Sequence, residues 1–390
     1  MTVQAPPPPR VLLVTFNRLM PADQGNSRRI MQLVGVYRRL GYEIDLVYHN
    51  EEGLDAGLSQ AMQAEFGRVQ VLASRASKRI REGHFALLSD WYDPALAQVC
   101  QEMHSLRGYQ VVHVNYVWYA PLLTGFGPEV VKVLDSHDLF AERSEKYRLA
   151  GMKPSWFSTT LAEEDSAFRM ADAVLAIQRG EAQEMAARGH RHVLYLPYVE
   201  AQVRPFEPPA QVPRLRLGYV GSGNDWNVRS MQAFVAALAR KAPVLPFQVA
   251  VAGGICRHVR EMPGLVNIGF VKELGGFYDG IDLALNPMVG GTGLKIKTVE
   301  PLSFGKPVLT TPSGAEGLAH LWTLPVLDSP EALVDYLFDT LLPDPVACLA
   351  ALHAQAVTSR AALDEEYAQQ TGRFSRWLAQ RVSAAALASA

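Results

Sequence analysis

Continuous apolar runs alternate along the chain with segments whose apolar residues recur every three or four positions. The first run, VLLVTF at 11–16, is typical of a strand buried on both faces. Residues 28–41 then show helical spacing that ends at Gly41, and residues 42–49 predict the next strand. The chain is therefore predicted to open with a strand, a helix and a strand.

The same alternation continues through the first half of the chain. Strands are predicted at 109–116, 130–138 and 172–178, with a helix at 162–171 between the last two. Such alternation predicts a parallel sheet with helices on both faces.

A second series begins after a polar, proline-rich segment at 200–213, which we interpret as an interdomain linker. Its predicted elements are a strand and glycine-rich loop at 215–226, a helix at 228–242, and strands at 247–254, 266–271, 281–287 and 306–311. The predicted fold class is α/β, with two Rossmann-like doubly wound domains.

We expect an N-terminal domain at 1–205, a second domain at 206–362 and a C-terminal helix at 363–390. The helix carries three aromatic residues on its apolar side, Tyr367, Phe374 and Trp377. Such an apolar side is typical of a helix that packs on a core, so we expect the helix to cross back to the first domain.

Composition narrows the class of protein. The chain has 390 residues, 48% apolar and 19% charged, and a net charge of −2, so no overall basic field favours nucleic acid or an anionic membrane. Three widely spaced cysteines, Cys100, Cys256 and Cys348, argue against a disulfide framework and a zinc knuckle. The polar N-terminus lacks the apolar core of a signal peptide, and no run approaches about 18 apolar residues, so we expect a cytoplasmic protein.

The segment GGTGLKIKTVE, residues 290–300, carries the strongest chemical signal. It follows a predicted strand, and its glycines allow the backbone to approach a ligand before a helix begins near Leu294. A helix start offers free N–H groups and a positive dipole end, where Lys295 is unfavourable unless an anion is present. Glu300 could accept hydrogen bonds from the two hydroxyls of a ribose, so the segment predicts a nucleotide site.

Lys295, Lys297 and Glu300 also fit a solvated helix face, which is the commoner role of such a trio. The density of glycine and the following GKPVL favour a ligand site. The Walker pattern is absent, which argues against a P-loop NTPase. Trp226 stands where the third glycine of a dinucleotide fingerprint belongs, which argues against a nicotinamide dehydrogenase.

These segments resemble glycosyltransferase family 4 and related enzymes of the GT-B fold, in a bacterial branch. The matching residues are NP before the glycines, GTGLKIKTVE, GKPVLTT and SGAEGL at 313–318, and weaker agreement extends over most of the chain. The resemblance implies that a sugar is transferred from a nucleotide-diphosphate donor to a glycan, lipid-linked or small-molecule acceptor. It further implies retention of configuration without a metal ion, so we expect no cofactor, and the net charge predicts no nucleic-acid partner.

The resemblance also implies roles for individual positions. The donor would be bound by Gly25, Asn26, Ser222, Gly223, Gly269, Phe270, Val271, Gly291, Thr292, Gly293, Leu294 and Lys297, and the catalytic residues would be His137, Lys295 and Glu300. Within these sets, Glu300 would hold the ribose, the segment 293–295 would meet the diphosphate and the segment 269–271 would border the base. The first domain would bind the acceptor and the second the donor.

Five residues leave the mechanism open. Thr292 stands where many family members have a glutamate that contacts the sugar, so the sugar is not specified. Arg28 or Arg29 is a further candidate for the leaving diphosphate. If configuration is inverted instead, a general base is needed, and His137 or Asp138 would supply it.

Two other functions fit the same site. A nucleotide-sugar epimerase would convert the donor without an acceptor, and a non-catalytic nucleotide-sugar-binding subunit is motivated by Thr292.

Basic residues concentrate in the segment 75–88, which fits a solvated helix face or a peripheral contact with anionic lipid at the inner face of the membrane.

Overall fold

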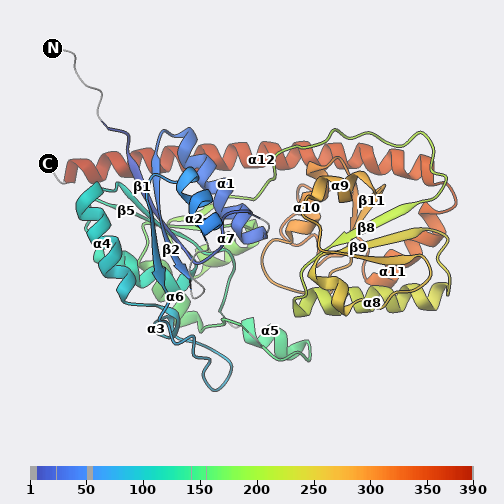
Figure 1. Ribbon diagram of the computed structural model, residues 1–390, viewed down its shortest axis with the longest axis horizontal. Helices are drawn as coiled ribbons and strands as arrows, with labels where there is room; N and C mark the ends of the chain where they lie inside the picture. Colours follow the sequence, from blue (N-terminus) through green and yellow to red (C-terminus); the bar gives the residue numbers. More distant parts are fainter. Residues whose placement is uncertain (1–6, 23, 51–55, 142, 155, 389–390) are drawn as a thin grey trace, which may run out of the picture. The chain divides into compact units, whose positions relative to one another are not determined.

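A computed structural model describes residues 7–22, 24–50, 56–141, 143–154 and 156–388. The chain divides by its contacts into two compact units, with Met1–Tyr198 and Ala368–Ala390 in unit 1 and Val199–Tyr367 in unit 2. Each unit is a parallel sheet with helices on both faces (Figure 1). The boundaries expected from the sequence, 205/206 and 362/363, lie a few residues from these divisions.

The sheet of unit 1 has seven strands in the order β3-β2-β1-β4-β5-β6-β7, and every neighbouring pair is parallel. Its strands are β1 Arg10–Thr15, β2 Glu43–Asn50, β3 Val69–Ala73, β4 Val111–Asn115, β5 Val131–Asp135, β6 Ala173–Ala176 and β7 Val193–Tyr195. Its helices are α1 Gly25–Arg39, α2 Ala56–Glu65, α3 Leu88–Trp91, α4 Ala95–Arg107, α5 Arg143–Leu149, α6 Leu161–Arg169 and α7 Arg179–Ala187, with a 3-10 segment at Val117–Gly125. The strand order reverses between β1 and β4, which creates a crevice at their carboxyl ends.

Unit 2 has five parallel strands in the order β10-β9-β8-β11-β12. Its strands are β8 Arg216–Val220, β9 Gln248–Ala252, β10 Leu265–Gly269, β11 Leu283–Asn286 and β12 Val308–Thr310. Its helices are α8 Asp225–Lys241, α9 Leu274–Asp279, α10 Ile296–Ser303 and α11 Pro330–Tyr336, with short segments at Gly254–His258 and Leu337–Leu341, followed by α12 Pro345–Ala388. The order reverses between β8 and β11, so unit 2 has a crevice of the same kind.

Alternation along the strands explains why both faces of the first sheet are covered. Val11 and Leu13 belong to one buried apolar cluster, whereas Leu12 and Val14 belong to the other. Successive side chains of a strand point to opposite faces, so a continuous apolar run needs helices on both sides. The predicted doubly wound fold is confirmed.

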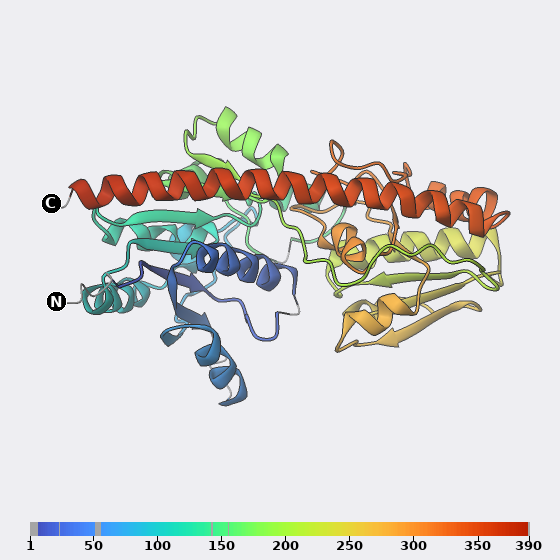
Figure 2. The ribbon, with the colours of Figure 1, turned by 90° about the horizontal axis from the view of Figure 1, so that it is seen from above.

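Helix α12 ends against unit 1, as the sequence predicted (Figure 2). Phe374 is 1% exposed, and its ring meets that of Tyr37 on α1 edge to face at 5.8 Å between centroids. Leu378, one turn further along, is fully buried, and Trp377 packs against the same cluster. The apolar stripe of the C-terminal helix therefore closes the core of unit 1.

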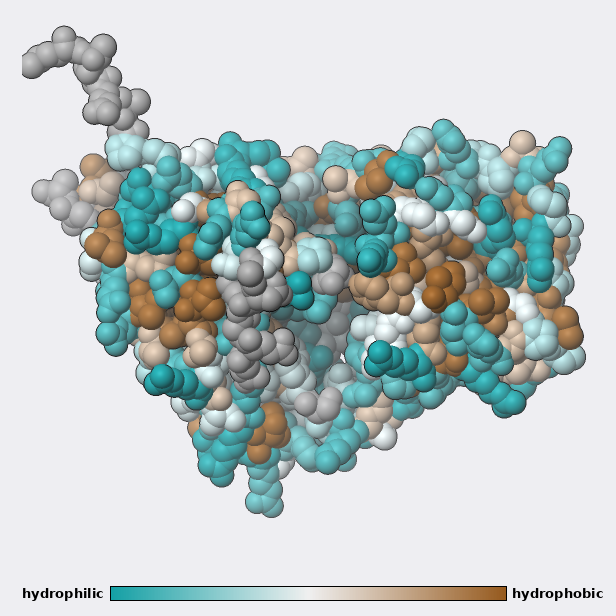
Figure 3. Space-filling view, in the orientation of Figure 1, coloured by the Kyte–Doolittle hydropathy of each residue, from teal (hydrophilic) through white to brown (hydrophobic). Residues whose placement is uncertain are grey.

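Helix α12 is also long and apolar enough, between Pro345 and Leu387, to pass a test for membrane-spanning helices based on length and composition. The sequence analysis did not foresee this, because no 18 residues there are all apolar. Leu349, Leu352 and Ala356 of this stretch are buried against the protein, and 39% of the tested window is buried in all. On the face drawn in Figure 3, hydrophobic side chains form separate patches amid hydrophilic surface.

The basic segment 75–88 is not a helix. It is an irregular loop in which Lys78 and His84 have positive φ values of 47° and 59°. Arg81 donates to both carboxylate oxygens of Asp90, at 2.7 and 2.9 Å. The expectation of a helix was therefore wrong, although Arg75, Lys78 and Arg79 are exposed, as a solvated segment requires.

The packing of α12 gives a first prediction. Phe374→Ala removes a buried ring from the core of unit 1 and should lower the free energy of unfolding by about 3–5 kcal/mol. Leu387→Ala, at a position 79% exposed on the same helix, should change it by less than about 0.5 kcal/mol. Urea unfolding followed by circular dichroism measures both, and equal stability of the two variants would contradict this role of α12.

Candidate functional site

The predicted donor-binding residues of unit 2 gather at the carboxyl ends of its strands. The loop after β11 holds the glycine segment, the loop after β8 holds Ser222 and Gly223, and β10 ends at Gly269. Because β8 pairs with β11 on one side and with β9 on the other, these loops flank the crevice of the sheet.

Glycine is required at several positions of the loop after β11. Gly291 and Gly293 have φ values of +130° and +68°, which side chains rarely adopt. At Gly290 a Cβ atom would lie 2.2 Å from the ring of Trp226. The glycine density reflects both backbone conformation and close packing.

Helix α10 begins at Ile296, with Lys295 at the position before its first residue. The sequence predicted the start near Leu294, and the extra residues lengthen the loop. Leu294, Thr292 and Gly293 are half-buried. The first N–H groups of α10 have no partner within the helix, so this end can receive an anion.

Lys295 is held in place by the loop it follows. Its side chain is 6% exposed, and Nζ donates to the main-chain oxygen of Gly293 at 2.7 Å. Nζ also donates to Oε2 of Glu316 at 2.8 Å, and that carboxylate side chain is 50% exposed. The ammonium group is thus fixed by one main-chain carbonyl of the loop and one half-exposed carboxylate.

Lys297 links the loop after β11 to the loop after β8. Its Nζ donates to Oδ1 of Asn227, whose Nδ2 donates to the main-chain oxygen of Ser222 at 2.9 Å. Nζ also lies 5.7 Å from the ring centroid of Tyr219. Burial, and secondarily the charge of Lys295, lower the pKa of Lys297 to about 7.

Glu300 lies inside the unit rather than on a solvated face. It is 6% exposed, and its Oε1 accepts a hydrogen bond from the hydroxyl of Tyr278 at 2.5 Å. The ring of Tyr278 in turn stacks on Phe304 at 4.5 Å. Since Lys295 is equally buried, the interpretation of this trio as a solvated helix face was wrong.

The other donor-binding candidates of unit 2 differ in exposure. Gly269 has a φ of +85°, and its main-chain oxygen accepts from the N–H of Gly253 at 2.8 Å. Phe270, the next residue, is 73% exposed, and Val271 is half-buried. A Cβ at Gly223 would lie 3.3 Å from the main-chain oxygen of Gly254, so these loops are closely packed.

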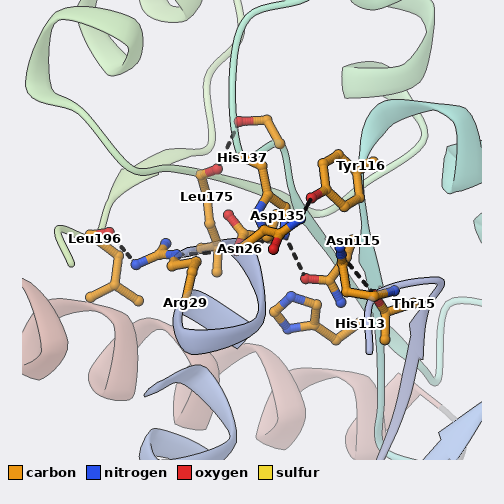
Figure 4. A network of polar contacts seen from close by, with 12 residues as sticks. Thr15, Asn26, Arg29, His113, Asn115, Tyr116, Asp135, His137, Leu175 and Leu196 are labelled. Atoms are coloured by element: carbon orange, nitrogen blue, oxygen red, sulfur yellow. Dashed lines mark hydrogen bonds and ion pairs between the residues drawn. The ribbon is translucent and has the colours of Figure 1, made fainter. Parts of the chain in front are cut away.

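In unit 1, His137 belongs to a buried polar network that follows β5 (Figure 4). Asp135 is fully buried, and its Oδ2 lies 3.1 Å from Nε of Arg29 and 3.6 Å from Nε2 of His137. His137 Nε2 also lies 3.0 Å from Oδ1 of Asn115. The imidazole stacks on the ring of Tyr116 at 4.2 Å, so its position is fixed on two sides.

These contacts determine the protonation of His137. Its side chain is 6% exposed, and burial lowers its pKa to about 4 despite the charge of Asp135. The imidazole is therefore neutral near pH 7. Nε2 faces two acceptor oxygens, so it carries the proton, and Nδ1 is left as an acceptor.

Arg29 does not suit the role considered for it at the leaving diphosphate. It is fully buried, and Nη1 donates to the main-chain oxygens of Leu196 at 2.6 Å and Pro197 at 3.3 Å. With Nε directed at Asp135, the guanidinium supports the network instead. Arg28 donates from Nε to the main-chain oxygen of Ala22.

Asp138 is also engaged. It is 9% exposed, its Oδ1 accepts from the N–H of Leu139 at 2.9 Å, and Oδ2 lies 3.6 Å from Nη1 of Arg143. Gly25 is the first residue of α1, and Asn26 donates from Nδ2 to the hydroxyl of Tyr116 at 3.1 Å. A part for Gly25 and Asn26 in donor binding stays a prediction.

Several residues that complete these sites were not identified from the sequence. Glu316 lies in the quoted SGAEGL segment, so a search for a carboxylate opposite Lys295 could have found it. Asn227 stands in the first turn after the GSG loop. Tyr278 and Asp135 carry no local signal, because only the sheet topology brings them to Glu300 and His137.

Residues 214–341 match a family model described as "Glycosyl transferases group 1". The matched range runs from the start of β8 beyond α11 and contains the whole candidate site of unit 2. Among curated proteins, none gives a significant match to the sequence.

Solved structures share the fold over nearly the whole chain. Sucrose-phosphate synthase from Thermosynechococcus elongatus is similar with a TM-score of 0.69 at 16% identity, over 95% of this chain and 99% of that one. Anabaena Alr3699/HepE, solved with UDP and glucose, gives 0.62 at 14% identity, over 95% and 99%. A UDP-forming α,α-trehalose-phosphate synthase from Burkholderia xenovorans gives 0.59 at 12% identity, over 97% and 99%.

These similarities confirm the predicted GT-B fold of two doubly wound domains. The match over 214–341, taken with this fold, supports the predicted class of glycosyl-transfer enzyme.

The buried histidines predict how stability depends on pH. His113 and His137 in unit 1 and His353 in unit 2 each have a pKa lowered by burial from 6.5 to about 4. Between these values the unfolded chain binds protons that the folded protein excludes. Stability should therefore be complete above pH 6.5 and fall toward pH 4, by up to about 1.4 kcal/mol per pH unit for each histidine.

His137→Gln should remove one histidine's share of this slope in urea unfolding measured across the window. His192→Gln changes an exposed residue of unit 1 and should leave the slope as it is. An unchanged slope for His137→Gln would contradict a neutral, buried imidazole.

Proposed function

We propose that the protein transfers a sugar from a nucleoside-diphosphate donor to a glycan, lipid-linked or small-molecule acceptor, with retention of configuration and without a metal ion or cofactor. The observation that carries this proposal is a pair of lysines and a glutamate, all partly or fully buried, on one glycine loop and helix start of the unit that matches the glycosyltransferase family. The reaction would take place in the cytoplasm or at the inner face of the membrane.

The donor would lie along the carboxyl ends of the strands of unit 2. Its diphosphate would meet Lys295, Lys297 and the first N–H groups of α10, close to Ser222 and Gly223. The ribose hydroxyls would donate to Glu300, which Tyr278 holds in position. A base placed beside Phe270 would cover an aromatic ring that is 73% exposed in the free protein.

Breaking the bond between sugar and phosphate builds negative charge on the departing diphosphate. Preorganised donors in a partly desolvated site stabilise such charge strongly, because they need little rearrangement during the reaction. Lys295 already has two partners that fix its ammonium group, and Lys297 has Asn227. The two lysines would thus supply the positive charge that a metal ion supplies in other transferases.

The low pKa of His137 and the contact between Asp138 and Arg143 support a reaction that retains the configuration of the sugar. An inverting reaction needs a general base whose pKa lies near the working pH. Burial lowers the pKa of His137 to about 4, which makes it a weak base, and Asp138 is directed at Arg143. His137 is better suited to accept a hydrogen bond at Nδ1 from a hydroxyl of the sugar or the acceptor.

The proposal is tested with a panel of nucleotide sugars. A bound donor raises the free energy of unfolding by about 2.7 kcal/mol at 100 times its dissociation constant, which thermal unfolding detects. We expect one donor to stabilise the protein and to be consumed only when an acceptor is present. Stabilisation by none of the panel would contradict the proposal. Binding without transfer or hydrolysis would indicate a non-catalytic subunit, and conversion of the donor without acceptor would indicate an epimerase.

Variants locate the donor in the same assay. Lys295→Ala and Glu300→Gln should each reduce donor affinity or kcat/KM by about tenfold or more, since each removes a charged contact to the donor. Lys306→Ala is the matched control, because Lys306 precedes β12 and so lies at the amino ends of the parallel strands, whereas the site lies at their carboxyl ends. Donor binding and kinetics like those of the unsubstituted protein in both site variants would refute the assignment.

Donor affinity should also depend on pH through Lys297. Its pKa is about 7 in the free protein, and a nearby diphosphate would raise it, so binding above pH 7 takes up a proton. Affinity should therefore be highest below pH 7 and fall as pH rises, by up to about tenfold per unit. Calorimetry of Lys297→Met should show weaker binding without this proton uptake, whereas Lys306→Met should keep it. Equal pH dependence in the two variants would exclude Lys297 as the source.

A further inference from the structure

Unit 1 carries a concentration of basic side chains that the candidate donor site does not use. It lies in two segments, one at 75–88 after β3 and the other at 142–156 around α5. Together these segments contain eight basic side chains and three acidic ones, in a chain whose net charge is −2. In Figure 1 the loop after β3 and helix α5 both project from the lower side of unit 1. Positive charge is thus gathered on one side of the unit.

The two segments meet around the ring of Trp91. Lys78 of the first segment and Trp156 of the second line the same pocket, which has a volume of about 100 Å³. Nζ of Lys78 lies 5.6 Å from the ring centroid of Trp91, and the ring of Trp156 lies 6.0 Å from the same ring. Arg143, the first residue of α5, places its guanidinium carbon 5.2 Å from the ring centroid of Trp156. These contacts join the loop and α5 into one continuous surface.

Half of the basic side chains are not balanced within the protein. Ion pairs with neighbouring carboxylates involve Arg81, Arg143 and Arg148. Four others are exposed and form no ion pair with any residue that the structure describes, namely Arg75, Arg79, Lys146 and Lys153. Exposed cations without a nearby carboxylate create a positive potential that attracts an anionic partner.

Apolar side chains are exposed among these cations. Leu149, the last residue of α5, is 74% exposed, and Ile80 and Trp156 are 40% and 38% exposed. Each would gain free energy by leaving water, and an indole is suited to the boundary between water and lipid because it has an apolar body and one polar N–H group. We call the four unpaired cations and these three apolar side chains the basic surface.

This composition selects a lipid bilayer among anionic partners. A soluble polyanion would satisfy the cations but leave Leu149 and Ile80 in water. A bilayer that contains anionic lipid offers negative headgroups to the cations and an apolar boundary to the exposed side chains. The rest of the chain has a net negative charge, so the attraction would turn the basic surface toward the bilayer.

We propose that unit 1 binds reversibly to bilayers containing anionic lipid through this basic surface. The proposal goes beyond the function proposed above and does not depend on it, because neither a donor nor an acceptor takes part in the contact. Both segments follow carboxyl ends of strands, β3 and β5, so this end of the unit would face the lipid headgroups.

Binding is tested by sedimentation of the full chain, without donor, with vesicles of phosphatidylcholine alone or mixed with phosphatidylglycerol. We expect binding only to the mixed vesicles, and its loss between about 0.1 and 1 M salt, because salt screens exposed charges. Arg79→Gln and Lys146→Gln should each weaken binding by about fivefold, since each removes one cation from the headgroups. Leu149→Ala should weaken it by about tenfold, since less apolar surface leaves water.

Matched controls come from the amino ends of the strands of the same unit. Arg191 is exposed shortly before β7, and Leu106, near the end of α4 and before β4, is 72% exposed. Arg191→Gln and Leu106→Ala remove the same groups as the variants of the basic surface, and both should bind mixed vesicles like the unsubstituted protein. Circular dichroism confirms that each variant is folded.

Three results would overturn the proposal. One is equal affinity for vesicles with and without phosphatidylglycerol. Another is binding of the variants of the basic surface that matches binding of their controls, which would place the lipid contact elsewhere, as on α12. The third is binding to soluble polyglutamate without binding to mixed vesicles, which would indicate an acidic macromolecule as the partner. No nucleotide sugar enters this assay, so its failure is distinguishable from failure of the donor assay.

Discussion

Two like charges held close together at the start of α10 are the constraint on which the candidate donor site depends. Lys295 is anchored by a carbonyl of the glycine loop and by Glu316, and Lys297 reaches across to Asn227. Burial first, and the repulsion from Lys295 second, lower the pKa of Lys297 to about 7, so the charged form of this side chain is costly in the free protein. A bound diphosphate would remove this penalty, and the same feature that costs stability in the free protein would favour the donor.

The buried charges of unit 1 are arranged differently from those of unit 2. There the buried charge is balanced internally, because Asp135 has Arg29 on one side and the neutral His137 on the other. Oδ1 of Asp135 and Nη2 of Arg29 have no hydrogen-bond partner within the described part of the chain, so the network is not fully satisfied. Such a network fixes the imidazole and the stacked rings of Tyr116 and Trp118 rather than contributing positive charge. The candidate site of unit 2 thus contains two lysine side chains, whereas the network of unit 1 holds a neutral imidazole in a fixed position.

The local sequence pattern was sufficient to predict an element where the segment is buried along its length. The runs around β1, β4, β8 and β11 predicted parallel strands, and the stripe of Phe374 and Trp377 predicted where α12 packs. The segment 75–88 was misinterpreted because its charges resemble a helix face, whereas positive φ at Lys78 and His84 breaks the helix. The glycine loop could be found from its own residues, but Tyr278, Asn227 and Asp135 come from distant elements. Their proximity to the site follows from strand order, which no local window contains.

The central claim is that the diphosphate of a sugar nucleotide binds at the glycine loop of unit 2. The most direct test is a crystal structure of the chain soaked with the nucleoside diphosphate that stabilises it most. The account predicts phosphate oxygens within hydrogen-bonding distance of Nζ of Lys295 and Lys297, and ribose hydroxyls on the carboxylate of Glu300. A nucleotide bound elsewhere, with this loop unchanged and Glu300 still bonded only to protein, would contradict it.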